Sequence, residues 1–364
     1  MNKKILVVIG TRPNFIKVTQ IKKQVLKYPH LEVKIVHTGQ HFDEKMANVF
    51  FEQFDLKPDF FLGIPQASAN TQMAEIMIRL EQFINSSFKP DLIIVVGDVN
   101  STLAAALTAN KLGIKIAHLE SGLRSNDKTM PEEINRILTD HITDIFFVTE
   151  PSGIENLLKE GYDESSIKYV GNTMIDTLVA YAQEIEKSSI MSVLNLKPKT
   201  FVLMTMHRPA TVDSKEGLTK LIELLTEVTT KYDVVFPIHP RTLKKLDEFG
   251  MKNFFDSNKH IILTEPLDYF AFQKLITESK FILTDSGGIQ EESTFLQIPC
   301  LTLRPNTERP VTVSEGTNTL VPFEIEKIMA LINQIENGSY KKGNIPNLWD
   351  GKTTERIIEL IANL

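Results

Sequence analysis

The sequence is poor in cysteine: its 364 residues include only Cys300, which lies within the apolar stretch QIPCLTL. A lone cysteine excludes an intramolecular disulfide, and the lack of disulfides is typical of a reducing compartment. The apolar setting favours packing over catalysis, because a reactive thiol needs an accessible and electropositive environment. We therefore expect a cytoplasmic protein in which Cys300 is buried.

Long hydrophobic runs and a surplus of positive charge are missing too. No segment approaches the roughly 18 apolar residues of a membrane helix, and the run from Ile5 to Ile9 is too short for a signal peptide. The formal net charge is −6, which disfavours nucleic acid and membrane surfaces as partners. Neither G-x-G-x-x-G nor G-x-x-x-x-G-K-[ST] occurs, so a standard dinucleotide or nucleoside-triphosphate site is not supported.

Short apolar, β-branched runs recur along the chain, and each is followed by a helix-like stretch. They predict strands at 4–10, 32–39, 91–98, 115–120, 145–150, 168–172, 201–207, 233–239, 261–265, 281–285, 299–304 and 317–321. Continuous apolar strands alternating with amphipathic helices are typical of parallel sheets covered on both faces. The sequence thus predicts an α/β fold with two doubly wound parallel-sheet domains facing each other.

The domain boundary is expected in the helical stretch MIDTLVAYAQEIEKSSIMSVLNL, which would bridge the two domains. We assign 1–176 to the first domain and 177–351 to the second. The amphipathic tail at about 352–364 predicts a last helix that packs back on the first domain.

Polar residues gather where the predicted strands of the first half end, the edge at which parallel α/β sheets bind ligands. Arg12 and Lys17 follow the first strand, although they also fit a plain βα turn with solvated basic residues. Asp98 ends the third strand, where it also fits a helix cap, and Glu120 ends the fourth. Glu132 begins a helix, where an acid is often only a dipole complement. Carboxylates that converge in this way favour proton transfer, because they raise one another's pKa.

The segment HTGQHFDEKM places His37, Gln40 and His41 close together. Two histidines suggest a metal site, but no cysteine, helical histidine pair or H-E-x-x-H motif accompanies them. We expect no metal.

In the second half, His207 and His239 both end predicted strands and both are followed by arginine within two residues, which favours an anionic ligand. Asp285 then closes a strand before Ser286-Gly287-Gly288 and a helix start. The glycines suit either a tight turn with positive φ or close approach of a phosphate to a helix N-terminus. We favour a diphosphate cradle, with Glu291 or Glu292 on a ribose and Arg309 on a phosphate.

The motifs together resemble one family, the non-hydrolysing UDP-N-acetylglucosamine 2-epimerases, from residue 4 to about 321. They are GTRPNFIK, HTGQHFDEKM, GDVNST, HLESGLRS, MPEEINR, GNTMIDTL, MHRPATVD, IHPRT, TDSGGIQEES and RPNTERPVTVSEGTN. The resemblance implies a glycosyltransferase-B fold with its site in an interdomain cleft. It also implies reversible epimerisation at C2, through elimination of UDP to a 2-acetamidoglucal and re-addition, without a cofactor.

The resemblance also implies roles for individual residues. The implied catalytic residues are Asp98, Glu120, Glu132 and His207. The implied UDP-binding residues are Arg12, Lys17, His239, Ser286, Gly287, Gly288, Glu292 and Arg309. Gln40 and His41 match a region where some members bind a second UDP-N-acetylglucosamine as an activator. A homodimer that serves cell-envelope or capsular polysaccharide synthesis is usual in the family.

Two departures leave the substrate open: Asn14 replaces a common glutamate, and GDVNST replaces G-D-T-x-[ST]. Relatives act on UDP-2,3-diacetamido uronic acids and on 6-deoxy amino sugars. A glycosyltransferase of the same fold would keep the second-half site but would not need the first-half carboxylates. A UDP-sugar sensor without catalysis would tolerate their loss, yet all three carboxylates are present.

Overall fold

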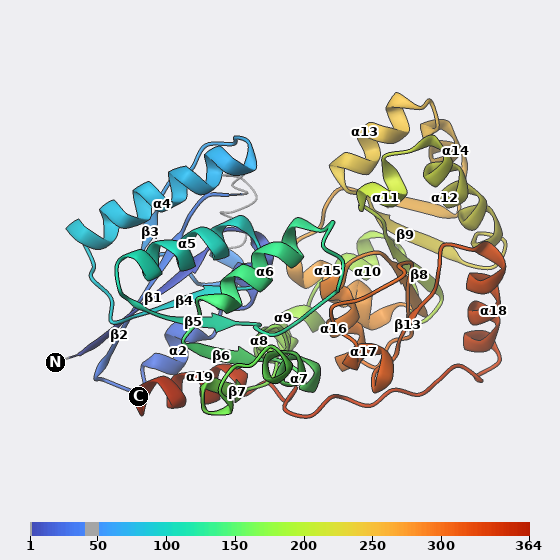
Figure 1. The fold of residues 1–364 in the computed structure, drawn as a ribbon. Helices are drawn as coiled ribbons and strands as arrows, with labels where there is room; N and C mark the ends of the chain where they lie inside the picture. The colour runs from blue at the N-terminus through green and yellow to red at the C-terminus, as the bar shows by residue number, and fades with distance from the viewer. Residues whose placement is uncertain (1, 41–50) are drawn as a thin grey trace. The chain divides into compact units, whose positions relative to one another are not determined.

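The structure is a computed structural model that describes residues 2–40 and 51–364. The chain forms two compact units (Figure 1). Unit 1 contains Met1–Ala180 and Asn347–Leu364, and unit 2 contains Tyr181–Pro346. The chain therefore leaves unit 1, builds unit 2 and returns to unit 1.

Unit 1 is built on a parallel sheet of seven strands in the order β3-β2-β1-β4-β5-β6-β7. The strands are β1 (Lys3–Ile9), β2 (Leu31–His37), β3 (Phe60–Phe61), β4 (Leu92–Val96), β5 (Lys115–Leu119), β6 (Ile145–Val148) and β7 (Ile167–Tyr169). All five residues of β4 are buried, which is expected of a strand covered on both faces.

Helices cover both faces of this sheet (Figure 1). They are α1 (Arg12–Ile16), α2 (Ile21–Val25), α4 (Ala69–Ser86), α5 (Asn100–Lys111), α6 (Pro131–His141), α7 (Pro151–Lys159), η1 (Glu164–Ser166), α8 (Thr173–Ala180) and α19 (Thr353–Ala362). Helices α4, α5 and α6 pack in a row on one face, and α2 and α19 lie together on the other. The last helix, α19, thus packs on unit 1.

Unit 2 repeats the plan with six parallel strands in the order β10-β9-β8-β11-β12-β13. The strands are β8 (Phe201–Thr205), β9 (Asp233–Pro237), β10 (Ile261–Thr264), β11 (Phe281–Thr284), β12 (Cys300–Thr302) and β13 (Asn318–Leu320). The helices are α9 (Ala182–Glu186), α10 (Ile190–Val193), α11 (Pro209–Val212), α12 (Lys215–Val228), α13 (Pro240–Glu248), α14 (Lys252–Ser257), α15 (Tyr269–Glu278), α16 (Gly287–Phe295), α17 (Val311–Ser314) and α18 (Ile325–Glu336). One apolar cluster joins the sheet to α12 and α18, and another joins it to α15 and α16.

The prediction of two doubly wound parallel sheets is confirmed, and each of the predicted strands is present with shifted ends. Strand β3 was not predicted, because its two residues are too few to show a pattern. The helical stretch expected to bridge the domains is divided into three helices, α8, α9 and α10. Residue 177 lies inside α8, so the first crossing between units comes at the end of that helix, at Ala180.

Cys300 is fully buried in β12, and burial raises the pKa of its thiol to about 11. This agrees with the packing role that its apolar setting predicts. Within the described ranges, no helix has the length and apolar character needed to cross a membrane.

Candidate active site

The carboxyl ends of β1, β4 and β5 bring three polar side chains together around Gly97. Lys17 and Glu120 form a buried ion pair through Nζ and Oε2. A Cβ atom at Gly97 would lie 3.3 Å from Nδ2 of Asn14 and 3.4 Å from both Lys17 Nζ and Glu120 Oε2. Polar side chains therefore do gather at this edge of the sheet, as predicted. The ammonium group of Lys17 compensates the charge of the buried Glu120 carboxylate.

Glu120 has a positive φ of 72°, a conformation that side chains other than glycine rarely adopt. Such a conformation costs about 1–3 kcal/mol and is concentrated at functional sites. Its backbone N–H is tied to the carbonyl of Phe147 on β6 at 3.0 Å. The surrounding structure thus holds this carboxylate in a conformation that its own backbone disfavours.

Asp98 lies at the end of β4 and pairs with Arg136, which pairs in turn with Glu133. Arg136 and Glu133 are buried, and Asp98 is part-exposed. Asp98 does not cap a helix, because α5 begins after Val99 without a side-chain cap. The prediction of a cap was wrong: the side chain turns to Arg136 instead.

Glu132 and Arg12 are less enclosed than the ion pairs. Glu132 is exposed in the first turn of α6, whereas its neighbour Glu133 is buried and accepts the N–H groups of Ser125 and Asn126. Arg12 is half-buried at the start of α1, beside Pro13 in the first turn. Arg136 thus connects Asp98 to Glu133 by ion pairs with both, whereas Glu132 lies at the surface of unit 1.

In unit 2, His207, His239 and Asp285 follow β8, β9 and β11, which are neighbours in the sheet. The rings of His207 and His239 lie 5.5 Å apart, and Nδ1 of His207 lies 2.8 Å from Oδ1 of Asp285. Burial opposes ionisation of Asp285, but the contact with His207 and two backbone N–H groups lower its pKa below the ordinary value. Burial and the charges of His207 and Arg241 lower the pKa of His239. The predicted grouping of both histidines on one rim is present.

The two glycines after Ser286 lie in the first turn of α16, and neither has a positive φ. The turn interpretation therefore does not explain them. A Cβ atom at Gly287 would lie 2.8 Å from both Arg309 NH1 and Glu308 Oε1. A glycine is thus needed at position 287 because other groups approach its Cα closely. In this structure these groups are the side chains of Arg309 and Glu308, which belong to the same unit.

Arg309 is buried and surrounded by carboxylates. Its Nε lies 2.9 Å from Oε2 of Glu291, and its NH1 contacts Glu308, which also pairs with Arg304 at 3.0 Å. Glu292 is buried on the same helix, and its charge contributes to raising the pKa of Tyr269 well above its usual range, although burial is the larger cause. Of the two adjacent glutamates, Glu291 is thus the one that holds Arg309.

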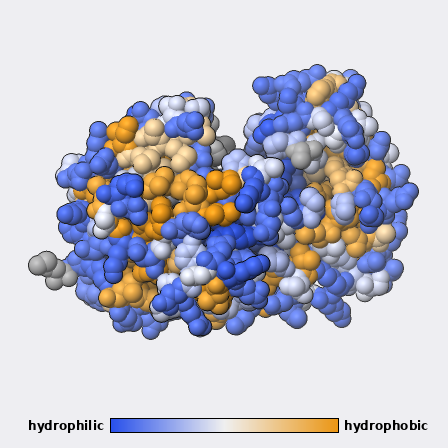
Figure 2. All heavy atoms as spheres, in the orientation of Figure 1, coloured by the Kyte–Doolittle hydropathy of each residue, from blue (hydrophilic) through white to orange (hydrophobic). Residues whose placement is uncertain are grey.

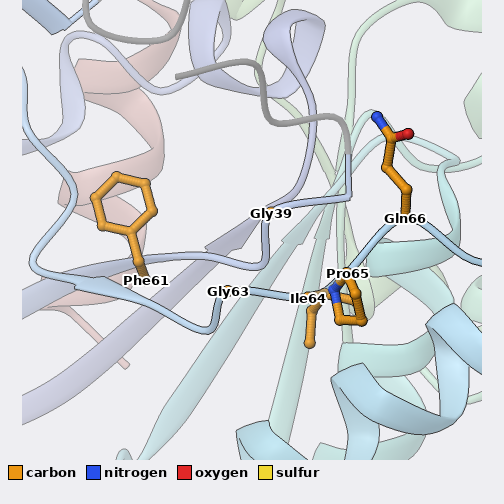
Figure 3. Close-up of a pocket in the computed structure, with 6 residues that line it drawn as sticks. All are labelled: Gly39, Phe61, Gly63, Ile64, Pro65 and Gln66. Atoms are coloured by element: carbon orange, nitrogen blue, oxygen red, sulfur yellow. The ribbon is translucent and has the colours of Figure 1, made fainter.

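The segment TGQH is described only as far as Gln40, and His41 lies outside the described residues. The side-chain oxygen of Gln40 accepts from the N–H and hydroxyl of Ser101, at 2.9 and 2.7 Å, at the start of α5. Beside it lies a hollow of about 440 Å³. Figure 3 shows the described residues that line it: Gly39, Phe61, Gly63, Ile64, Pro65 and Gln66. Across residues 2–40 and 51–364, no group of three or more His, Cys, Asp or Glu side chains is arranged to hold a metal ion.

Sequence reasoning missed four residues that build the unit 1 site: Asn14, His118, Arg136 and Asp140. Asn14 accepts from the Gly10 N–H and donates to the Val96 carbonyl, so it joins β1 to β4. Arg136 lies three residues after Glu133 on one helical face, a spacing that indicates an ion pair.

Comparison with known proteins decides the family. Residues 23–362 match the family model described as UDP-N-acetylglucosamine 2-epimerase. The chain belongs to this family. Two relatives show how far the similarity extends. A UDP-N-acetylglucosamine 2-epimerase of Methanocaldococcus jannaschii is 40% identical over 99% of both chains. A UDP-2,3-diacetamido-2,3-dideoxy-D-glucuronate 2-epimerase of Pseudomonas aeruginosa is 37% identical over 99% of this chain and 100% of its own.

A solved structure agrees with the family assignment. The crystal structure of the Methanocaldococcus jannaschii epimerase, in complex with UDP-GlcNAc and UDP, has a TM-score of 0.90 and 40% identity, covering 99% of this chain and 100% of that one. The epimerase family and the glycosyltransferase-B type of fold inferred from the motifs are thus confirmed, and the chain is an enzyme of the isomerase class.

Proposed function

We propose that this epimerase interconverts UDP-N-acetylglucosamine and UDP-N-acetylmannosamine at C2. The observation that carries the proposal is the buried Lys17–Glu120 pair at Gly97, in a chain 40% identical to an epimerase whose structure holds UDP-GlcNAc and UDP. A carboxylate held beside the strand ends is the residue type that proton transfer at C2 needs.

The proposed reaction begins with loss of the C2 proton to a protein base. The electron pair of the C2–H bond forms the C1–C2 double bond, and the C1–oxygen bond breaks so that UDP leaves with its electron pair. A proton is then added to the opposite face of C2, and a UDP oxygen attacks C1. Two faces of C2 require two proton carriers, for which Asp98, Glu120 and Glu132 of unit 1 and His207 of unit 2 are the candidates.

Departure of UDP requires compensation of the negative charge that develops on the diphosphate. We assign this task to the N-terminus of α16 at Ser286, Gly287 and Gly288, where the N–H groups of the first turn and the helix dipole favour an anion. His239 and Arg309 of unit 2, with Arg12 and Lys17 of unit 1, are the further proposed phosphate partners, and Glu292 is the proposed ribose partner. In the structure Lys17 and Arg309 are paired with carboxylates, so a bound diphosphate would compete with those pairs.

A second substrate class is favoured by one observation. The Pseudomonas aeruginosa relative, named for a UDP-2,3-diacetamido uronic acid, is 37% identical, close to the 40% of the archaeal enzyme. The candidate carboxylates would serve either sugar, because both reactions take place at C2.

Proton NMR of the purified protein with UDP-N-acetylglucosamine in deuterated water tests the proposal. We expect deuterium at C2 and a growing anomeric signal of UDP-N-acetylmannosamine. Free UDP with free sugar would instead indicate a hydrolysing enzyme. No change with this sugar, but C2 exchange with the diacetamido uronic acid, would establish the second substrate class.

Three finer expectations belong to the same proposal: a cytoplasmic location, a homodimer and an activating second UDP-N-acetylglucosamine. Figure 2 shows apolar surface on unit 1. The exposed apolar side chains of unit 1 include Ile78 of α4 and Ile134 and Leu138 of α6, which supports a dimer through these helices. Light scattering of the wild type and of Leu138→Glu measures the oligomeric state, and a monomeric wild type would refute the dimer. Sigmoidal dependence of the rate on substrate would support the activator.

A further inference from the structure

A fully buried histidine links the loop that carries Asp98 to the loop that carries Glu120, two of the candidate carboxylates of unit 1. His118 on β5 has Nδ1 2.6 Å from Oδ1 of Asp140, near the end of α6, and Nε2 2.8 Å from the carbonyl oxygen of Gly97. A carboxylate and a carbonyl both accept hydrogen bonds, so the ring is placed to donate from both nitrogens. We name this arrangement, from Gly97 through His118 to Asp140, the His118–Asp140 strut.

The second oxygen of Asp140 holds the loop that follows β5. It accepts the backbone N–H of Gly122 at 3.1 Å and NH1 of Arg124 at 2.7 Å. Burial opposes ionisation of Asp140, but His118 and Arg124 lower its pKa below the ordinary value. The carboxylate of Asp140 thus contacts three residues of the segment 118–124, namely His118, Gly122 and Arg124.

These contacts lie on either side of two of the three candidate catalytic carboxylates, Asp98 and Glu120. Asp98 directly follows Gly97, whose carbonyl His118 holds. Glu120 lies between His118 and Gly122, both of which Asp140 contacts, and it keeps its positive φ of 72° between these fixed points. Asp140 itself is fully buried, so it would act on the reaction through other residues.

We propose that Asp140 is a positioning residue for the epimerisation, which through His118 and Gly122 sets the placement of Asp98 and Glu120. This inference rests on the proposed function. Because the strut supports proton transfer and not nucleotide recognition, its loss should lower kcat and leave UDP affinity in place. Outer partners of this kind typically change activity by about 10–100-fold.

The test is Asp140→Asn, which keeps the shape of the side chain but presents an N–H₂ group on one side. That group either faces the N–H donors of Gly122 and Arg124, which breaks those contacts, or faces Nδ1 of His118, which replaces the charged contact with a neutral hydrogen bond. We expect kcat to fall about 10–100-fold, with the calorimetric Kd for UDP within about threefold of wild type. Normalising kcat to the UDP-binding stoichiometry removes any effect of unfolded protein.

Glu160→Gln is the matched control. Glu160 pairs with Nε and NH2 of Arg124, at 2.8 and 2.7 Å, on the side away from Asp140, so the variant removes a charge from the same network. We expect its kcat to stay within about twofold of wild type. An equal loss of kcat in both variants would show a general effect of charge and overturn the inference.

His118→Asn decides the question if Asp140→Asn does not fold. Its amide N–H₂ replaces Nδ1 toward Asp140 but does not reach the carbonyl of Gly97, so only the connection to the Asp98 loop is lost. We expect kcat to fall here as well, with UDP affinity kept. Wild-type kcat in a folded variant of either residue would overturn the inference. A wild-type chain without turnover would instead refute the proposed function, and the inference with it.

Discussion

Asp285 fixes both the ring and the backbone of His207. One carboxylate oxygen lies 2.8 Å from Nδ1 of His207, and the other accepts the backbone N–H groups of His207 at 2.8 Å and of Arg208 at 2.7 Å. The acid that ends β11 thereby positions the histidine that follows β8, the neighbouring strand. The strand order, which cannot be read from the sequence, places β8 beside β11 and so brings the motifs of His207 and Asp285 together.

Asp285→Asn should destabilise unit 2 and slow turnover. The amide oxygen can still accept the two N–H groups, but an N–H₂ group replaces the anionic partner of the His207 ring, and we expect a loss of about 1–3 kcal/mol at pH 7. Because the folded state lowers the pKa of Asp285, its stabilisation is present above the unfolded pKa and disappears as pH falls through the folded value. The free energies of unfolding in urea should therefore differ between the variant and the wild type at pH 7 and become similar in strong acid. Equal stability at pH 7 would contradict this account.

Glu120→Gln should abolish turnover while UDP still binds. The change removes the charge of the buried carboxylate with little change in shape, and loss of a proton carrier typically costs about 10²–10⁴-fold. Initial rates with UDP-N-acetylglucosamine and calorimetry with UDP give the two readouts. Glu75→Gln, in the part-exposed pair with Arg79 on α4, serves as the control and should remain active. Substantial epimerisation by the Glu120 variant would remove it from the catalytic assignment.

Gly287→Ala should weaken UDP binding. The added Cβ would meet Arg309 NH1 and Glu308 Oε1 at 2.8 Å, too close to be accommodated without moving the buried Arg309. We expect the Kd for UDP to rise by about tenfold or more, equivalent to about 1.4 kcal/mol. Gly250→Ala is the control: it has a positive φ of 67° and open space around it, so it carries the backbone cost alone. Unchanged UDP affinity in the Gly287 variant would show that the phosphate cradle is misplaced.

His37 should make stability fall as the solution becomes acidic. Burial lowers the pKa of this histidine from 6.5 to about 4, so between these values the unfolded chain binds more protons than the folded one and protonation favours unfolding. From pH 7.5 to pH 5 we expect the contribution of His37 to decrease by about 2 kcal/mol. His37→Asn can keep the acceptor for the Gly39 N–H but cannot titrate, so its unfolding free energy should fall less over this range.

The parts of the fold that repeat a local pattern were predictable from the sequence. The apolar strands, the helix start at Pro131 and the tail helix each follow from a run of neighbouring residues. The histidines at positions 207 and 239 were correctly placed on one rim, because parallel strands end at a common edge.

The pairings within the site could not be read in this way. His118 and Asp140 are separated by 22 residues and lie on a strand and a helix, so no sequence spacing indicates their contact. The choice between Glu132 and Glu133 depends on the direction in which the first turn of α6 faces, and the structure buries only Glu133. The role of Gly287 likewise depends on Arg309, which approaches it from beyond β12.

The return of the chain to unit 1 has a consequence for biosynthesis. Asn347–Leu364 complete unit 1: Nε1 of Trp349 donates to the Thr149 carbonyl at 3.0 Å, and Asp176 accepts the N–H of Thr353 at 3.0 Å. When the first 180 residues have been synthesised, unit 1 therefore still lacks residues 347–364. Unit 2, in contrast, is continuous in sequence. Unit 1 starts first but is completed only after residues 347–364 have been translated, so its unfinished face is exposed to chaperones while unit 2 is synthesised.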